Sequence, residues 1–175
     1  MPKTLTATRE SIQPRLGRAS GLISTWLPVA IGLAIIVIES TDGLSAEKTS
    51  HFLRPFFAWL FGPMTDEHWQ VFHHILRKCG HFVGYGSLGI AWLRAWLRTL
   101  ATRLQWTQAA WRLRAAALGV VCTFLTASAD EYHQTFLPSR TGQFSDVLLD
   151  TCGALIFTSI VAIFWWRQHS AADVH

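Results

Sequence analysis

Charged residues are scarce in this chain: Asp, Glu, Lys and Arg make up 15% of its 175 residues, whereas half of the residues are hydrophobic. Nine Trp and eleven Phe exceed what a soluble domain of this size usually carries. The formal net charge of +4 does not indicate a nucleic-acid partner, because the basic residues lie beside apolar segments and form no tract or stripe. The composition therefore predicts an integral membrane protein.

Cysteine is also rare, and Cys79, Cys122 and Cys152 all fall within apolar stretches. Their odd number and the lack of metal-type spacing argue against a disulfide and against a zinc site, so we interpret them as small core residues. The sequence also lacks a Ser nucleophile elbow, a Gly-rich phosphate loop and an HExxH motif. These absences exclude the enzyme classes that such motifs identify.

Long apolar runs, in contrast, are present, and four of them have the length of about 20 residues that is needed to cross a bilayer. They cover residues 22–38, 79–97, 111–129 and 147–166. The aromatic-rich residues 52–61 and the amphipathic residues 65–77 are shorter and are expected to lie along the headgroup boundary. The sequence thus predicts an all-α fold, an integral membrane bundle of four transmembrane helices with one or two interfacial helices between the first and the second.

All of these segments belong to one expected membrane domain, residues 21–167. Residues 1–20 are polar and basic and are expected to form a flexible cytoplasmic tail, and residues 168–175 a second cytoplasmic tail. A cleavable signal peptide is a weaker interpretation of the first apolar run, which exceeds the usual length of roughly 7 to 15 residues.

The distribution of Lys and Arg predicts the orientation of the helices. With the N-terminus in the cytoplasm, ten of the fifteen basic residues lie on the cytoplasmic side, the direction that the positive-inside rule expects. Both termini are then cytoplasmic. An aromatic belt of six tryptophans lies at the inner interface in this orientation: Trp92, Trp96, Trp106, Trp111, Trp165 and Trp166.

Polar and ionisable residues gather where the predicted helices meet the outer leaflet. Each ionisable group at membrane depth costs roughly 2.5 to 3.5 kcal/mol on insertion scales, so a chain that keeps several together is expected to use them. Helical spacing places the polar residues of each predicted helix on one face of that helix. The sequence therefore predicts a polar pocket, open to the outside, between the second, third and fourth spanning helices. Its candidate residues are Lys78, His81, Tyr85, Asp130, Glu131, Gln134, Arg140, Asp146 and Asp150.

Each of these residues also has a structural interpretation. Lys78 could extend its ammonium group to the interface, Asp146 could cap the fourth helix, and Asp130 and Glu131 could be solvated, because charge costs least at helix ends. The functional interpretation, a shared polar pocket, is favoured because polar residues of separate helices converge at the same end of the bundle.

Four glycines lie within the second spanning segment, where they are expected to keep the helix slim so that a neighbouring backbone can approach. The same glycines could serve a dimer, so the oligomeric state stays open. They are Gly80, Gly84, Gly86 and Gly89.

Three motifs within this region carry a family resemblance: KCGHFVGYGSL at residues 78–88, DEYHQTFLPSR at residues 130–140 and DVLLDTCG at residues 146–153. With them, residues 22–166 resemble the VanZ-like membrane protein family. Asp150 departs from the pattern, because many members have Asn there, and a charged Asp150 needs a partner such as Lys78 or Arg140. The matching signature positions are Lys78, His81, Tyr85, Asp130, Glu131, Gln134, Phe136, Pro138, Arg140, Asp146 and Gly153.

The resemblance implies a fold and a compartment, the bacterial cytoplasmic (inner) membrane, more firmly than a reaction. The founding member of the family is associated with low-level resistance to the glycopeptide antibiotic teicoplanin and acts on the cell envelope without rebuilding the peptidoglycan precursor. For most relatives no biochemical activity is assigned.

Three functional hypotheses follow. In the first, the pocket binds an anionic group of a membrane lipid or a lipid-linked envelope precursor. Lys78, His81 and Arg140 bind that anionic group. Its expected binding residues are Lys78, Tyr85, Gln134, Arg140, Asp146 and Asp150.

In the second hypothesis, the chain is an enzyme of hydrolase or phosphotransfer type with His81, Asp130 and Glu131 as catalytic candidates. Its carboxylates could then hold a divalent Mg²⁺ or Ca²⁺ ion. The third hypothesis is proton or ion transport, which is weakened because the inner halves of the helices offer no acidic ladder. The sequence leaves the ligand, catalysis and metal dependence open.

Overall fold

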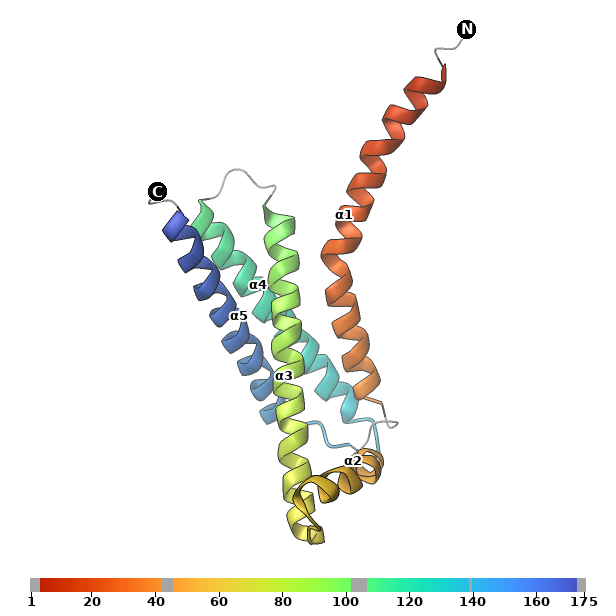
Figure 1. The fold of residues 1–175 in the computed structure, drawn as a ribbon, viewed down its shortest axis with the longest axis vertical. Helices are drawn as coiled ribbons and strands as arrows, with labels where there is room; N and C mark the ends of the chain where they lie inside the picture. The colour runs from red at the N-terminus through yellow and green to blue at the C-terminus, as the bar shows by residue number, and fades with distance from the viewer. Residues whose placement is uncertain (1–3, 42–45, 102–106, 139, 173–175) are drawn as a thin grey trace.

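A computed structural model of the chain contains helices and no strand in the residues that it describes, which are 4–41, 46–101, 107–138 and 140–172, with side chains for residues 21–164 of these ranges. In chain order the helices are α1 (Thr4–Glu39), α2 (Ala46–Phe61), α3 (Asp66–Leu100), α4 (Gln108–Gln134) and α5 (Phe144–Ala172). Figure 1 shows four long helices running along the molecule, with α2 lying across the end at which α3 begins. The all-α prediction is confirmed.

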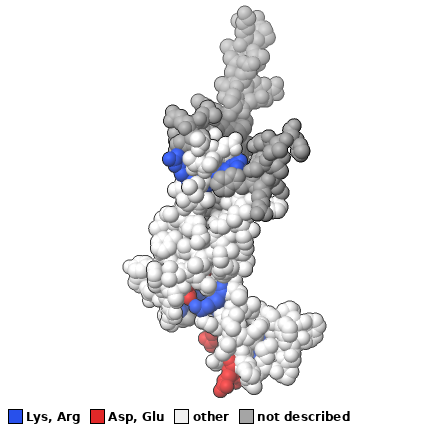
Figure 2. Space-filling model, turned by 90° about the vertical axis from the view of Figure 1, so that its left-hand side faces the viewer, with Lys and Arg blue, Asp and Glu red and all other residues white. Residues whose placement is uncertain are grey.

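Within the described part of the chain, three helices are long and apolar enough to cross a membrane, through residues 21–39 of α1, all of α4 and residues 144–164 of α5. Large apolar side chains on these helices, such as Val37, Leu125 and Ile160, are more than half exposed, which suits a surface that faces lipid. Figure 2 shows a broad uncharged band of surface between charged groups near the two ends of the molecule. The chain therefore has the build of a membrane protein.

The helix α3 joins two segments that the sequence predicts as separate, the interfacial residues 65–77 and the spanning residues 79–97. Thr65 caps this helix by accepting a hydrogen bond from the backbone N–H of His68, and no proline interrupts the 35 residues that follow. Gly80 lies within the helix and does not end it. Among the described residues only α2 is a separate short helix between α1 and α3, and its interfacial position stays a prediction.

Aromatic side chains attach α2 to the first part of α3. The ring of Phe57 packs on the ring of Phe72 with centroids 4.9 Å apart, and Thr49 shares a hydrogen bond of 3.2 Å with His73. Phe52 and Trp59 point away from this contact and are at least 80% exposed. Pro55 lies within α2 and does not end it.

The predicted tail over residues 1–20 is helical from Thr4, where α1 begins, and its flexibility stays a prediction. The cysteines are free thiols, but Cys79 and Cys152 are exposed, so their interpretation as core residues is wrong. Both lie on faces that no other helix covers, and a thiol is apolar enough to remain there in contact with lipid.

The helix α3 contacts all four other helices, and its approach to α4 and α5 depends on glycine. A Cβ atom at Gly89 would lie 2.9 Å from the Cβ of Ala154, and one at Gly119 would lie 3.2 Å from the backbone nitrogen of Leu93. Gly86 likewise faces a partner, the ring of Phe157. The prediction that a neighbouring backbone approaches is thus confirmed for Gly89, whereas Gly86 leaves room for a side-chain ring.

The same prediction is wrong for Gly80 and Gly84, because a Cβ atom at either position would have nothing within 4 Å. The reason is helical geometry, since at about 100° per residue Gly80 and Gly84 lie on the side of α3 opposite to Gly86 and Gly89.

Replacing Gly153 by Ala is expected to destabilise the bundle. The added Cβ would collide with the carbonyl oxygen of Phe82, a backbone atom of α3 that cannot rotate away. Overpacking of this kind costs about 1–3 kcal/mol. Thermal unfolding in one detergent measures the effect, with Gly84→Ala as the matched control in open space. Equal melting temperatures for the two variants would contradict the packing described here.

Candidate functional site

The two ends of the bundle differ in charge. At the end where α4 stops and α5 starts lie all the Asp and Glu side chains that the structure describes, and we call it the acidic end. The other end, which we call the basic end, carries arginines of α3 and α4. Figure 2 shows the two charged zones separated by the uncharged band. All nine candidate site residues lie at the acidic end.

A polar cavity of about 180 Å³ opens at the acidic end between α3, α4 and α5. Because α3 is continuous, His74, Lys78 and His81 follow one another at helical spacing and line it together with Arg77. From α4 and α5 come Glu131, Gln134 and Asp146, and from the connecting segment Arg140 and Gln143. The predicted pocket between three helices is therefore present in the geometry.

At the mouth of this cavity Lys78 and Asp146 form an ion pair, with 2.7 Å between Nζ and Oδ1. Both side chains remain about one third exposed, so water screens the pair and its contribution to stability is modest. The pair joins the start of the apolar part of α3 to the first turn of α5.

Deeper in the bundle, Tyr85 and Gln134 both donate a hydrogen bond to Asp130. The Tyr85 hydroxyl donates to Oδ2 of Asp130 over 2.9 Å, and Nε2 of Gln134 donates to the same oxygen over 3.0 Å. Tyr85 is almost fully buried, and Asp130 lies behind the cavity, not on its wall. Asp130 instead lines a recess beside α1 that also includes His133.

The third contact between helices joins His81 and Asp150. The Nδ1 atom of His81 lies 3.6 Å from Oδ2 of Asp150, which is within ion-pair range but too long for a hydrogen bond. Asp150 is fully buried, and neither of its carboxylate oxygens accepts a hydrogen bond from the described part of the chain. The sequence predicts Lys78 or Arg140 as the partner of Asp150; the structure gives it His81, because Lys78 is held one turn earlier by Asp146.

Glu131 fastens the segment between α4 and α5. Its Oε2 accepts a hydrogen bond of 2.7 Å from the backbone N–H of Gln143, and Gly142 packs against its carbonyl oxygen so closely that a Cβ would not fit. From the same segment Arg140 donates to the carbonyl oxygen of Glu39 at the end of α1, over 2.7 Å. This segment therefore forms a fixed wall of the cavity.

Arg77 is absent from the predicted site residues, yet it lines two cavities at once. The second has a volume of about 310 Å³ and lies under α2, where Leu53, Leu76 and His81 also contribute to its walls. Burial and the nearby Arg140 guanidinium lower the pKa of Arg77, while Glu39 raises it. Arg77 and Arg140 thus repel each other across the polar cavity.

The structure therefore divides the predicted site into two groups. Lys78, His81, Glu131, Gln134, Arg140 and Asp146 line the polar cavity, whereas Tyr85, Asp130 and Asp150 support it from behind.

The residues that sequence reasoning missed are His74, Arg77 and Gln143. A detectable signal existed for two of them, since His74 and Arg77 lie four residues before Lys78 and His81. The sequence predicts two separate segments that divide at residue 78, so these residues are not expected to share one helix face.

A metal ion finds little support in this geometry. Among the described side chains, no group of three or more His, Cys, Asp or Glu is arranged to hold one. The acidic side chains are instead directed at Lys78, at the Tyr85 hydroxyl and at the Gln143 backbone. The same cavity wall also carries the guanidinium groups of Arg77 and Arg140 and the imidazole rings of His74 and His81, which are donor types suited to an anionic oxygen.

Comparison with known protein families agrees with the motifs in these helices. The VanZ/LLP1 family model matches residues 25–165, which is most of the chain and includes every residue of the polar cavity. No curated protein and no solved structure matches the chain.

Replacing Tyr85 by Phe is expected to lower the stability of the fold. The change removes one of the two donors to Asp130 in a buried place, a loss that costs about 1–3 kcal/mol. The other tyrosine, Tyr132, is exposed, so Tyr132→Phe is the matched control. Thermal unfolding in detergent should show a lower melting temperature for Tyr85→Phe alone; parallel behaviour of both variants would argue against a structural role of the Tyr85 hydroxyl.

Proposed function

The chain belongs to the VanZ/LLP1 family, and we propose that it binds an anionic group of a lipid or of a lipid-linked envelope component in the polar cavity. The observation that carries the proposal is the convergence of Arg77 and Arg140 on that cavity. Guanidinium groups suit phosphate and carboxylate, because they donate two parallel hydrogen bonds to such a group.

The membrane arrangement that goes with this proposal has α3 as a fourth span. The protein is then a multi-pass protein of the bacterial cytoplasmic membrane, with both termini in the cytoplasm and the acidic end facing outward. Support comes from Arg94, Arg98, Arg112 and Arg114, which lie at the basic end and follow the positive-inside rule. The exposed rings of Phe52 and Trp59 on α2 suit the outer headgroup region.

The charges around the cavity favour an anion over a cation. The two carboxylates on its wall already have partners, since Asp146 binds Lys78 and Glu131 accepts the Gln143 N–H. Arg77 and Arg140 carry like charges that face the same space. An anionic oxygen between them relieves their repulsion, which a cation would increase.

The surroundings of the cavity suggest a lipid as the carrier of that anion. The cavity under α2 shares Arg77 and His81 with the polar cavity, but its other walls include Leu53 and Leu76. A headgroup can therefore reach the arginines from the side while its chain stays against apolar surface.

Substituting Arg77 or Arg140 by Gln is expected to weaken the binding of a polyprenyl phosphate by about tenfold or more, because each variant loses a charge-assisted hydrogen bond worth about 1.5–3 kcal/mol. Lipid titration of the purified protein with a fluorescent or calorimetric readout measures this. Arg54→Gln is the control, because Arg54 lies at the same end but pairs with Asp66 outside the cavity. An equal loss of lipid affinity in all three variants would show that binding depends on the overall surface charge and not on a site formed by Arg77 and Arg140.

Resistance to teicoplanin-type glycopeptides is the cellular consequence that the proposal includes. Expression in a glycopeptide-sensitive host should then raise the inhibitory concentration, and Arg140→Gln should abolish the rise. An unchanged inhibitory concentration with the unmodified chain would separate this protein from the resistance association.

A second candidate function is an enzyme of hydrolase or phosphotransfer type, which one observation favours. His81 lines the cavity while its Nδ1 faces the buried carboxylate of Asp150, so Nε2 is the ring atom left for a ligand. A carboxylate behind an imidazole orients the ring and stabilises its protonated form. Asp130 and Glu131 are committed to Tyr85, Gln134 and Gln143, which favours supporting roles for both.

Phosphate release from a lipid-linked pyrophosphate tests this candidate. An enzyme requires measurable turnover that His81→Gln abolishes, and Asp150→Asn should shift the pH dependence of kcat because the charge behind His81 is lost. Absent turnover in the presence of tight lipid binding would leave the binding function alone.

Proton or ion transport gains no support from the bundle core. Between the polar cavity and the basic end the buried side chains include Leu88 and Leu93. The buried hydroxyls of Thr123 and Thr158 donate to carbonyl oxygens of their own helices. A conducting path needs polar groups throughout its depth.

A further inference from the structure

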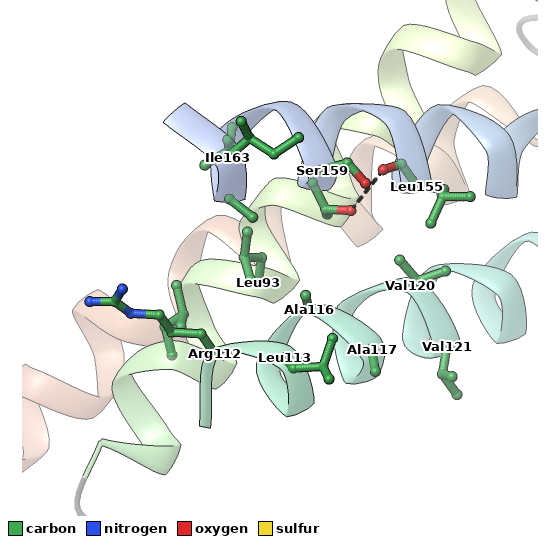
Figure 3. Close-up of a pocket in the computed structure, with 14 residues that line it drawn as sticks. Leu93, Arg112, Leu113, Ala116, Ala117, Val120, Val121, Leu155, Ser159 and Ile163 are labelled. Atoms are coloured by element: carbon green, nitrogen blue, oxygen red, sulfur yellow. Dashed lines mark hydrogen bonds between the residues drawn. The ribbon is translucent and has the colours of Figure 1, made fainter. Parts of the chain in front are cut away.

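A further cavity, distinct from those at the acidic end, lies near the basic end between α3, α4 and α5. Its volume is about 550 Å³. Figure 3 shows Leu113, Ala117 and Val121 of α4 on one side and Leu155 and Ile163 of α5 on the other. None of the residues that line it also lines the polar cavity.

This cavity is a groove that opens sideways toward lipid. Leu113, Val121, Leu155 and Ile163 line it and are each about half or more exposed. Small side chains such as Ala117 do not extend into the groove, so side chains of α4 and α5 leave it unfilled. In a bilayer such a groove is filled by whatever apolar group fits its shape.

The positive charge at the basic end favours an occupant that carries an anionic group. Arg112 lines the groove at the end opposite to Val121 and Leu155 (Figure 3). Its guanidinium lies 5.9 Å from the ring centre of Trp111 and donates to the side-chain oxygen of Gln108 over 3.3 Å. Arg114 is exposed nearby on the same helix, and no acidic side chain is described at this end.

The length of the groove fits one leaflet. Arg112 and Val121 are nine residues apart on α4, which is about 14 Å at 1.5 Å per residue. Half of a hydrocarbon core of about 30 Å is close to that length. A helix of a partner protein would instead need a continuous groove across the whole membrane and a width of about 10 Å.

We infer that this groove binds one acyl chain of an anionic phospholipid from the leaflet at the basic end, with the phosphate at Arg112. The chain runs from Arg112 toward Val121 and Leu155. Hydrophobic burial alone gives no selectivity, since the bilayer is as apolar as the groove. Selectivity for an anionic headgroup comes from Arg112, at about 1 kcal/mol for one basic side chain near the headgroups.

The inference is independent of the proposed function, because it concerns the opposite end of the bundle. The test therefore uses the full chain carrying Arg140→Gln, in which the proposed anion site is impaired. Phosphatidylglycerol and phosphatidylcholine with the same acyl chains are added in detergent, and retained lipid is counted by native mass spectrometry. We expect phosphatidylglycerol to be retained about fivefold better, the ratio that 1 kcal/mol gives.

Two pairs of variants locate the binding. Arg112→Gln should remove the preference for phosphatidylglycerol, whereas Arg114→Gln, which removes the same charge outside the groove, should keep most of it. Ala117→Phe fills the groove and should abolish retention of both lipids, whereas Ala34→Phe on the exposed face of α1 should not. Ser159→Leu, which fills the groove from α5, is the substitute if Ala117→Phe does not fold.

Four results would overturn the inference. Equal retention of the two lipids, or equal behaviour of Arg112→Gln and Arg114→Gln, would show that no specific headgroup site exists. Retention that neither Ala117→Phe nor Ser159→Leu reduces would place the lipid elsewhere. A dimer in the unmodified chain that Ala117→Phe converts to a monomer would identify a second copy of the chain as the occupant.

Discussion

The site depends on one constraint: an ionisable side chain near membrane depth needs a partner, and α3 brings three polar side chains to carboxylates on its neighbours. Lys78 meets Asp146, His81 meets Asp150 and Tyr85 meets Asp130. Spacings of three and four residues place these side chains on one face of α3, so the contacts form a ladder along the seam between α3 and its neighbours, two with α5 and one with α4. The rotation of α3 relative to α4 and α5 is therefore defined by charge as well as by packing.

Small residues make that ladder possible. The closeness of α3 to α5 at Gly89 and Ala154, and to the backbone of α5 at Gly153, brings side chains of moderate length into contact across the seam. The segment after α4 then closes over the result, because Glu131 accepts the Gln143 N–H and Arg140 donates to the end of α1. Asp130 and Glu131, which the sequence suggests as catalytic, thus hold neighbouring segments together, whereas His81 lines the cavity with Arg77 and Arg140.

The two ends of the molecule use arginine for different purposes. At the acidic end, Arg77 and Arg140 lie among carboxylates in a cavity of defined volume, an arrangement that suits recognition of one anionic group. At the basic end, Arg112 borders an open apolar groove without acidic neighbours among the described side chains, which suits the phosphate surface of a leaflet. Both proposals name a lipid as the partner, through an anionic group at the acidic end and through a phosphate with one acyl chain at the basic end.

The sequence by itself determined the helical class, the family, and the end of the bundle at which polar residues gather, because hydropathy and helical spacing are local properties. It did not determine that residues 65–77 and 79–97 belong to one continuous helix, because the change from a polar to an apolar pattern at residue 78 marks no helix end. It also could not assign partners. Whether Asp150 faces Lys78, Arg140 or His81 depends on the rotation and depth of helices distant in sequence, and only the tertiary structure decided in favour of His81.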